Sequence, residues 1–273
     1  MGETPNHLRS AAGATTGAVR QFFTGAALLG RGLGLVLRHP RLLALGLLPA
    51  LIAGILYAAA LITLIVFVDD AARAVTWFAD DWSSFARDLI RVVAGAMLLG
   101  LGGLLGVLTF TAVTLLIGDP FYEKISALVE ARYGGVPDEV EVPFWQSMRR
   151  SLVDSLRLIG LSIVLGLPLF VLGFIPVVGQ TVVPVLGAAV GGWLLATELT
   201  GAPFQRRGQR LHHRRAALKA RRPLSLGFGV AVFASFLIPL GAVLLMPAAV
   251  AGAALLSRKV LGQPTEITTV RSL

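Results

Sequence analysis

The sequence predicts an all-α integral membrane protein with two long transmembrane helices and two pairs of short apolar helices. Hydrophobic residues make up 55% of the 273 residues and charged residues only 14%, with a mean hydropathy of +0.78. Soluble domains carry about 25% charged residues, so this deficit indicates that much of the chain is solvated by lipid. Residues 42–68 and 92–118 form two runs without a single charge, and shorter uncharged runs follow them.

Both long runs exceed the roughly 20 residues that a helix needs to cross a bilayer. We therefore predict that each is a transmembrane helix. The second run meets Gly118, Asp119 and Pro120, where a flexible residue, a charge and a helix breaker follow one another, so we expect the helix to end there. The segment between the two runs contains Trp77 and Trp82, which is typical of an aromatic belt at the lipid headgroups.

The N-terminal region divides into two parts. Residues 1–16 are small and polar, which predicts a disordered tail. Residues 17–38 repeat apolar residues at helical spacing beside Arg20, Arg31 and Arg38, which favours a helix lying in the membrane interface. An amphipathic helix docked on another domain is the alternative. We expect a membrane domain over residues 17–258 and a C-terminal cytoplasmic tail over residues 259–273.

The two pairs of short apolar runs are marginal for a full crossing. The first pair covers residues 158–175 and 181–197, and the second covers 224–238 and 240–256; the turn within each pair carries no charge. Two re-entrant hairpins and four short spans both fit this pattern, and we favour hairpins. Backbone at membrane depth is tolerated only where protein or water covers it.

The distribution of Arg and Lys predicts which side of the membrane each loop occupies. Five Arg lie in the first 41 residues, five basic residues in 118–157 and eight in 200–223, whereas segment 69–91 has three Arg against five Asp. The positive-inside rule then puts the N-terminus, the two basic loops and the C-terminus in the cytoplasm. The basic loop 206–222 lacks interleaved aromatics, so we expect it to contact anionic lipid rather than nucleic acid.

The sequence offers little for catalysis. It has no cysteine and none of the common phosphate-loop, zinc-protease, nucleophile-elbow or EF-hand motifs,. Its four histidines lie in polar segments, so solvated side chains are a better interpretation than metal ligands. We therefore expect no cofactor, no metal site and no enzymatic activity.

Two places are candidates for binding a substrate. Gln180 and Thr181 lie at an otherwise apolar turn, where a polar side chain either serves function or bonds the free backbone of the turn. Arg38 and Arg41 flank Pro40 at the start of the first long run, where free N–H groups of a helix attract anions. Ordinary flanking charge that sets orientation is the alternative for the arginine pair.

Several segments of the sequence resemble a known protein family. Segment 174–184, FIPVVGQTVVP, resembles the central segment of CysZ-type bacterial sulfate permeases, within the etoposide-induced-protein superfamily. The resemblance runs over roughly residues 20–258, and it is carried by Pro120, Phe121, Glu130, Arg132, Pro176, Gly179, Pro184, Pro239 and Pro247. It implies a homo-oligomeric inner-membrane permease. One segment departs from the family, because Arg41, Leu42, Leu43 and Ala44 stand where the family has Gly-hydrophobic-Arg-Arg for sulfate binding.

The function that we predict is transport of sulfate or a similar small oxyanion across the bacterial inner membrane. Arg38, Arg41, Gln180 and Thr181 are the residues that we expect to meet the anion. A membrane scaffold of the same superfamily, which would interact through its cytoplasmic loops without transport, is the alternative.

Overall fold

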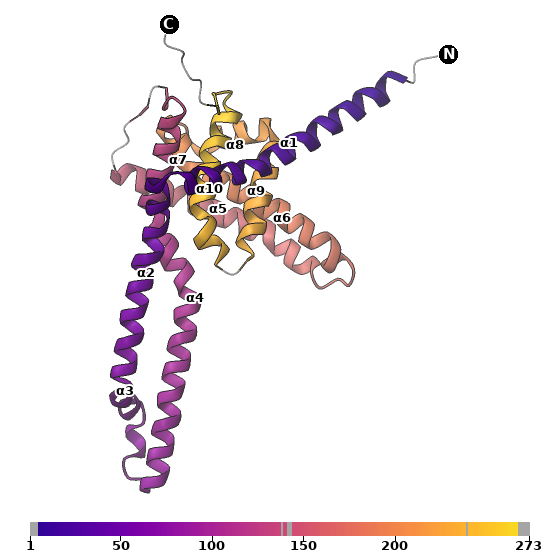
Figure 1. Cartoon of the computed structure of the whole chain (residues 1–273). Helices are drawn as coiled ribbons and strands as arrows, with labels where there is room; N and C mark the ends of the chain where they lie inside the picture. Colours follow the sequence, from indigo (N-terminus) through magenta and orange to yellow (C-terminus); the bar gives the residue numbers. More distant parts are fainter. Residues whose placement is uncertain (1–4, 138, 141–143, 239, 267–273) are drawn as a thin grey trace. The chain divides into compact units, whose positions relative to one another are not determined.

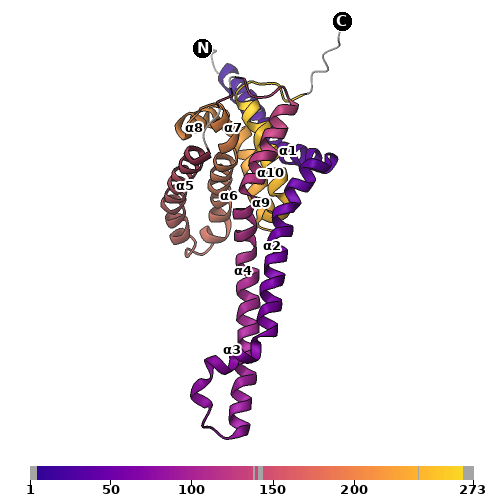
Figure 2. The same cartoon turned by 90° about the vertical axis from the view of Figure 1, so that its left-hand side faces the viewer.

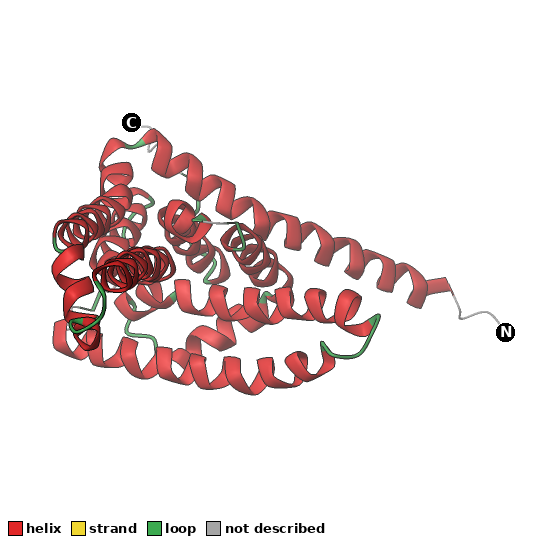
Figure 3. Ribbon diagram, turned by 90° about the horizontal axis from the view of Figure 1, so that it is seen from below, coloured by secondary structure: helices red, strands yellow, loops and turns green. Residues whose placement is uncertain are grey.

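The computed structural model describes residues 5–137, 139–140, 144–238 and 240–266. Every regular element in these ranges is a helix (Figure 3), which confirms the all-α prediction. The chain divides into two compact units, residues 47–120 and residues 1–46 with 121–273. We describe each unit by itself.

The unit of residues 47–120 is a long helical hairpin. It contains most of α2 (Pro40–Val66), then α3 (Val68–Val75), the short 3-10 helix η1 (Trp77–Ala79) and the first part of α4 (Ser84–Arg132). Both views place α2 and α4 side by side (Figures 1 and 2). Tyr57 connects them, because its hydroxyl lies 2.6 Å from Thr109 Oγ1 and its ring meets Phe110 edge to face. The outward apolar side chains of this hairpin are exposed, as lipid-facing helices require.

α4 does not end at the proline where the sequence predicts its end. It continues through Pro120 to Arg132, so that prediction is wrong. A proline inside a helix removes one backbone hydrogen bond. The residues that follow compensate for this loss, because Tyr122, Ile125 and Val129 are all buried.

The unit of residues 1–46 and 121–273 is built around α9 (Arg222–Phe236) and α10 (Gly241–Val260). α1 (Pro5–Arg38) packs on both, α6 (Val178–Leu199) packs on α9, and α5 (Phe144–Leu172) packs on α6 (Figure 1). The short helices α7 (Gly201–Arg206) and α8 (Leu211–Ala220) connect α6 to α9. The core includes Leu28, Phe204, Phe228, Leu255 and Leu256, each almost fully buried.

α1 has one packed apolar face and one exposed apolar face. Its buried stripe is Gly25, Leu28, Gly32 and Val36, at spacings of three and four residues. Val19, Phe23 and Leu37 lie elsewhere on the helix and stay exposed. The helix begins at Pro5, inside the stretch for which the sequence predicts a disordered tail. The predicted domain boundaries at residues 16 and 258 stay predictions, as does the location of α1 in the membrane interface.

Glycines set how closely the helices of this unit approach. A Cβ atom on Gly32 would lie 2.2 Å from the carbonyl oxygen of Ala248, and one on Gly227 would lie 1.9 Å from that of Phe22. Any larger residue would force these backbones apart. Small residues at such contacts are the usual basis of helix packing in lipid.

Five helical segments in the described part of the chain are long and apolar enough to cross a membrane: Pro40–Val66, Ser84–Arg132, Leu152–Leu172, Val178–Leu199 and Gly241–Val260. The protein is therefore a multi-pass membrane protein. α9 has only 15 residues. At 1.5 Å per residue it spans about 22 Å, less than the roughly 30 Å hydrocarbon core.

The turns of the two short pairs are strained. Val177 has φ 69° and ψ −52°, and the Val178 N–H donates to the Pro176 carbonyl at 2.8 Å, which is the rare γ-turn with a positive φ. Leu240 has φ 59°. Non-glycine residues adopt a positive φ only at a cost in energy, so both reversals are tight and specific.

Candidate functional site

The arginines predicted to meet an anion lie beside a helix junction. Arg38 is the last residue of α1 and Arg41 is the second residue of α2, and both side chains are exposed. His39 makes the junction, because its carbonyl accepts from the N–H groups of Leu42 and Leu43, both at 3.0 Å. Its ring Nδ1 lies 2.7 Å from the Leu35 carbonyl oxygen. Neither arginine has an ion-pair partner in the described ranges.

The other predicted pair lies at the start of α6. The Thr181 hydroxyl donates to the Val177 carbonyl at 2.6 Å, so it supports the strained turn, as the alternative interpretation expects. Gln180 is exposed next to it. No contact in the described ranges joins this pair to Arg38 or Arg41, and a substrate role for all four residues stays a prediction.

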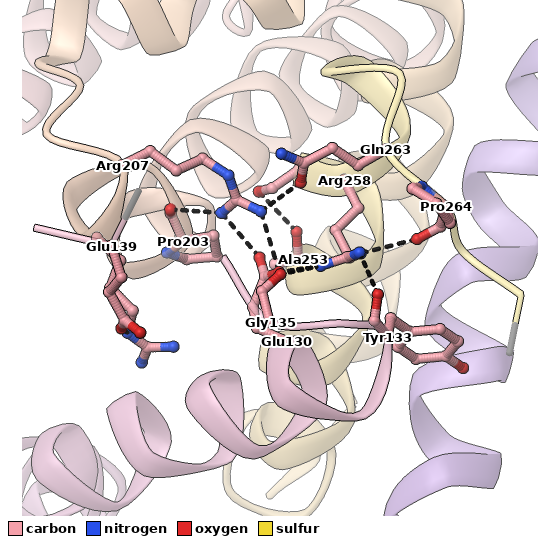
Figure 4. Close-up of polar contacts among 12 residues, drawn as sticks. Glu130, Tyr133, Gly135, Glu139, Pro203, Arg207, Ala253, Arg258, Gln263 and Pro264 are labelled. Atoms are coloured by element: carbon pink, nitrogen blue, oxygen red, sulfur yellow. Dashed lines mark hydrogen bonds and ion pairs between the residues drawn. The ribbon is translucent and has the colours of Figure 1, made fainter. Parts of the chain in front are cut away.

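A buried charged cluster forms where the end of α4, the residue after α7 and the end of α10 meet (Figure 4). Glu130, in the last turn of α4, is 1% exposed. Arg207, just after α7, holds it with two parallel bonds: Nη1 donates to Oε1 at 2.9 Å and Nη2 to Oε2 at 3.0 Å. From α10, Arg258 Nη1 donates to Oε2 at 2.7 Å. We call these three residues the Arg207–Glu130–Arg258 cluster.

Backbone carbonyls hold Arg258 in place. Its Nη1 also donates to the Gly135 carbonyl at 2.7 Å, its Nη2 to the Tyr133 carbonyl, and its Nε to the Pro264 carbonyl at 2.7 Å. The sequence builds this cradle through Gly134 and Gly135, whose φ values of 98° and 74° reverse the chain after α4. A glycine pair is expected to break the chain between helices, but its carbonyl contact with Arg258 is not predictable from the sequence.

The charges of the cluster do not balance. Two guanidinium groups share one carboxylate, which leaves one net positive charge on side chains no more than 5% exposed. Burying an ion is costly unless hydrogen bonds and an opposite charge compensate. A buried charge that is incompletely neutralised is therefore a candidate for a functional site. An excess cation in such a place is suited to attract a small anion.

Polar groups without a partner lie at the cluster. The Nε of Arg207 and the hydroxyl of Ser126 are buried and have no hydrogen-bond partner in the described part of the chain. Ser126 precedes Glu130 by four residues on α4, so the two side chains lie on the same face of that helix. Buried polar groups normally find a partner. An anion that approaches Arg207 would accept a hydrogen bond from its Nε.

Arg206 precedes Arg207 in the sequence and contacts two residues outside the cluster, Glu123 and Glu139. Its Nη2 donates to the Glu123 carbonyl at 2.6 Å, and its Nε lies 3.9 Å from Glu139 Oε1. Burial lowers the pKa of the Arg206 guanidinium, and the charges of Glu139, Glu123 and Glu130 oppose that shift. Glu139 and Glu123 are both exposed, and neither forms an ion pair with Arg207 or Arg258 in the described ranges.

A second buried arginine is less suited to an anion. Arg214 on α8 lies 3.8 Å from Asp154 on α5, and the nearby Glu198 accepts a hydrogen bond from Ser155 at 2.8 Å. Burial lowers the pKa of the Arg214 guanidinium, while Asp154 and Glu198 raise it. Arg215 is a second cation beside these two carboxylates, so the charges of this group balance, and it ties helices together rather than attracting anions.

The residues that carry the family resemblance fall into three places. Glu130 lies at the centre of the cluster, whereas Arg132 is exposed two residues later. Pro120 and Phe121 continue α4. The α5–α6 turn and the start of α6 contain Pro176, Gly179 and Pro184. Pro247 lies inside α10, and a side chain placed at Gly46 would touch its ring. Pro239 lies outside the described residues.

Gly179 shows why a glycine is needed at its position. A Cβ there would lie 2.2 Å from the carbonyl oxygen of Gly173. The two arms of the turn approach each other too closely for any side chain.

Comparison with known proteins agrees with these features. The model of the protein family described as "Sulfate transporter CysZ/Etoposide-induced protein 2.4" matches residues 28–247. A protein named sulfate transporter CysZ from Pseudomonas syringae pv. tomato is 33% identical over 177 residues, which cover 64% of this chain and 68% of that protein. Two proteins of the same name from Pseudomonas fluorescens strains are 33% identical over 150 residues and 30% identical over 178 residues. These matches cover 54% and 64% of this chain, and 60% and 69% of the relatives.

Proposed function

The chain belongs to the sulfate transporter CysZ and etoposide-induced protein 2.4 family, and we propose on this premise that it is a bacterial inner-membrane permease for sulfate or a similar small oxyanion. The family is one of transporters and not of enzymes. The relatives named above carry the name of sulfate transporter, which supports sulfate as the first substrate to test.

The observation that carries the proposal is the excess positive charge of the Arg207–Glu130–Arg258 cluster. Arg207 and Arg258 are 5% and 3% exposed, and Glu130 neutralises only one of them. An electrostatic attraction is stronger in a low-dielectric interior than in water. An oxyanion that arrives there would supply the missing negative charge and would accept from the free Nε of Arg207.

Three polar residues follow one another on the face of α4 that contains Glu130. Tyr122, Ser126 and Glu130 follow one another at four-residue spacing on α4, and all three are buried. Residues at this spacing lie on one face of a helix. The hydroxyl groups on this face would add hydrogen-bond donors for an oxyanion that reaches the paired arginines.

We propose that Arg38 and Arg41 bind the anion at the end of α2 that the positive-inside rule places on the cytoplasmic side,. Both side chains are exposed, so salt screens their attraction for the anion. Purified protein in liposomes should take up radiolabelled sulfate. The double substitution Arg38→Ala and Arg41→Ala should slow uptake several-fold at low salt, with a smaller effect at high salt.

The matched control removes two exposed cations elsewhere in the same unit, Arg20→Ala with Lys124→Ala. Uptake equal in both double variants would remove Arg38 and Arg41 from the site. Liposomes that contain correctly inserted wild-type protein and take up no oxyanion would instead support the scaffold function.

The two short pairs are proposed to be re-entrant hairpins in an oligomer. α9 is too short for a full crossing, and α10 is largely buried inside the chain. At the α5–α6 turn, however, Phe174 and Val177 are 75% and 70% exposed. If that turn ends inside the hydrocarbon, its backbone needs a protein cover. A second copy of the chain would supply it.

A further inference from the structure

A cleft opens between three helices at the end of the basic loop. It is lined by Trp193 of α6, Lys219 of α8, and Arg222 and Leu226 of α9, and it has a volume of about 390 Å³. Its lining combines two cationic side chains with the indole ring of Trp193 and the apolar side chain of Leu226. None of these four residues belongs to the Arg207–Glu130–Arg258 cluster.

More positive charge surrounds the cleft. Arg221 precedes Arg222 in the sequence, and both Arg221 and Arg31 lie close enough to Lys259 for their charges to act on it. Glu266 is the acidic group that acts on Lys259 with the opposite sign. In the part of the chain that the structure describes, no ion-pair partner lies within 4.0 Å of any of the five cations, which are Lys219, Arg222, Arg221, Arg31 and Lys259. Lys259, Arg31 and Arg221 therefore outnumber Glu266, so the surroundings of Lys259 keep a net positive charge.

The position of the cleft along the helices fits a lipid headgroup. Arg222 is the first residue of α9 and Lys219 lies in the last turn of α8, so the charges lie where the apolar helix begins. Leu226 follows Arg222 by one turn, on the same face. Trp193 adds an indole ring, the side chain that is enriched at membrane interfaces.

We propose that this cleft binds one anionic phospholipid, with the headgroup phosphate between Lys219 and Arg222 and the start of an acyl chain along Trp193 and Leu226. A free phosphate would use only the two cations and would leave the apolar wall exposed to water. A zwitterionic lipid would bring its own cation toward a region that is already positive. The combination of charge and apolar wall selects an anionic amphiphile, and this inference does not depend on which anion is transported.

The test uses the quenching of Trp193 fluorescence by brominated lipid in the full-length protein. Trp77, Trp82 and Trp145 are replaced by Phe, which leaves Trp193 as the reporter. Protein in detergent micelles is titrated with phosphatidylglycerol brominated near the headgroup. Each cation near an anionic lipid contributes about a factor of five in affinity, so Lys219→Gln with Arg222→Gln should weaken binding roughly 30-fold.

The matched control is Lys124→Gln with Arg132→Gln, which removes one lysine and one arginine that are exposed on α4. It should retain the affinity of the unsubstituted reporter. A charge-retaining pair, Lys219→Arg with Arg222→Lys, should also retain most of it, which separates loss of charge from damage to the fold.

Three results would overturn the proposal. Brominated phosphatidylcholine could quench as strongly as phosphatidylglycerol, which would reduce the cleft to a groove for any acyl chain. The control pair could weaken quenching as much as the cleft pair, which would show only a general charge effect. Inorganic phosphate at equal concentration could displace the brominated lipid fully, which would make the site a free-anion site.

Discussion

Arg258 makes four hydrogen bonds that no other side chain could make at its position. Its planar guanidinium reaches Glu130 and the carbonyls of Tyr133, Gly135 and Pro264 at once. A lysine has three donors on one atom and lacks this fork geometry. The same residue therefore joins α10, the turn after α4 and the C-terminal segment, and it also contributes to the excess charge of the cluster. Structure and proposed function depend on one guanidinium.

Removing the carboxylate should be costly because it leaves two buried cations side by side. We expect Glu130→Ala to lower the free energy of unfolding by about 3–5 kcal/mol, the usual cost of breaking a buried ion pair. Thermal unfolding in detergent measures this loss. Glu123→Ala removes an exposed carboxylate elsewhere on α4 and should change stability little. Equal effects of the two substitutions would contradict a buried, structurally essential Glu130.

The sequence predicts only part of this site. Glu130 is identifiable through the family resemblance, but its partners are 77 and 128 residues away, and no local pattern indicates such pairings. Arg207 lies in a run of basic residues and resembles its solvated neighbours. Arg258 gives a weak signal, as a charge in the last turn of an apolar helix. Which arginine of a basic segment is buried depends on the packing of α7 and α10, and hydropathy does not report it.

At the scale of the elements, hydropathy predicts the helices well and their ends poorly. Most of each charge-free run, 42–68 and 92–118, lies within a single helix. The helix end predicted at Pro120 is wrong because burial of the following turns outweighs one lost hydrogen bond. The reversals at Val177 and Leu240 are expected as turns, but their positive φ angles are not. Tight local turns impose those angles, because the Val178 N–H donates to the Pro176 carbonyl and the Gly241 N–H donates to the Ile238 carbonyl, both at 2.8 Å.

The contact of α1 with α10 allows a sharp test of packing. A methyl group on Gly32 would lie 2.2 Å from the Ala248 carbonyl oxygen and 2.6 Å from the Gly252 nitrogen. These are backbone atoms, so the helices themselves must move. Overpacking of this kind typically costs about 1–3 kcal/mol, and we expect Gly32→Ala to lose at least about 2 kcal/mol of stability, measured by thermal unfolding in detergent.

Gly34→Ala on the same helix is the control, because no described residue outside its own helix turn lies within 4 Å of the place that its methyl group would occupy. It should be neutral or slightly stabilising, since alanine favours helix over glycine. A large loss for Gly34→Ala, or none for Gly32→Ala, would mean that α1 does not pack on α10 in this register.

At the scale of the whole molecule, the charge distribution predicts the side of the membrane on which each loop lies, and the helix lengths bear on how deeply each helix pair enters it. Basic residues predict which side each loop occupies, and that prediction is the same for re-entrant hairpins and for full spans. Helix length bears on the depth of each pair, and the 15 residues of α9 argue for partial penetration. The side of each loop and the depth of each helix pair therefore have to be tested at separate labelling positions within one experiment.

The absence of native cysteines makes that experiment direct, because single introduced cysteines report only their own location. Gln209→Cys, in the basic loop, should react with an impermeant reagent added from the cytoplasmic side alone. Asp81→Cys, between α2 and α4, should react from the outside alone. Val178→Cys, at the α5–α6 turn, should react from neither side if the turn ends within the membrane.

The second turn is tested at Leu237, which is 70% exposed. Gly241 is unsuitable there, since a Cβ atom on it would lie 2.1 Å from the Ser235 carbonyl oxygen. Reaction of Gln209→Cys from outside would reverse the orientation. Ready reaction of Val178→Cys and Leu237→Cys from outside would replace the hairpins by four full spans and would leave the sidedness of the loops unchanged.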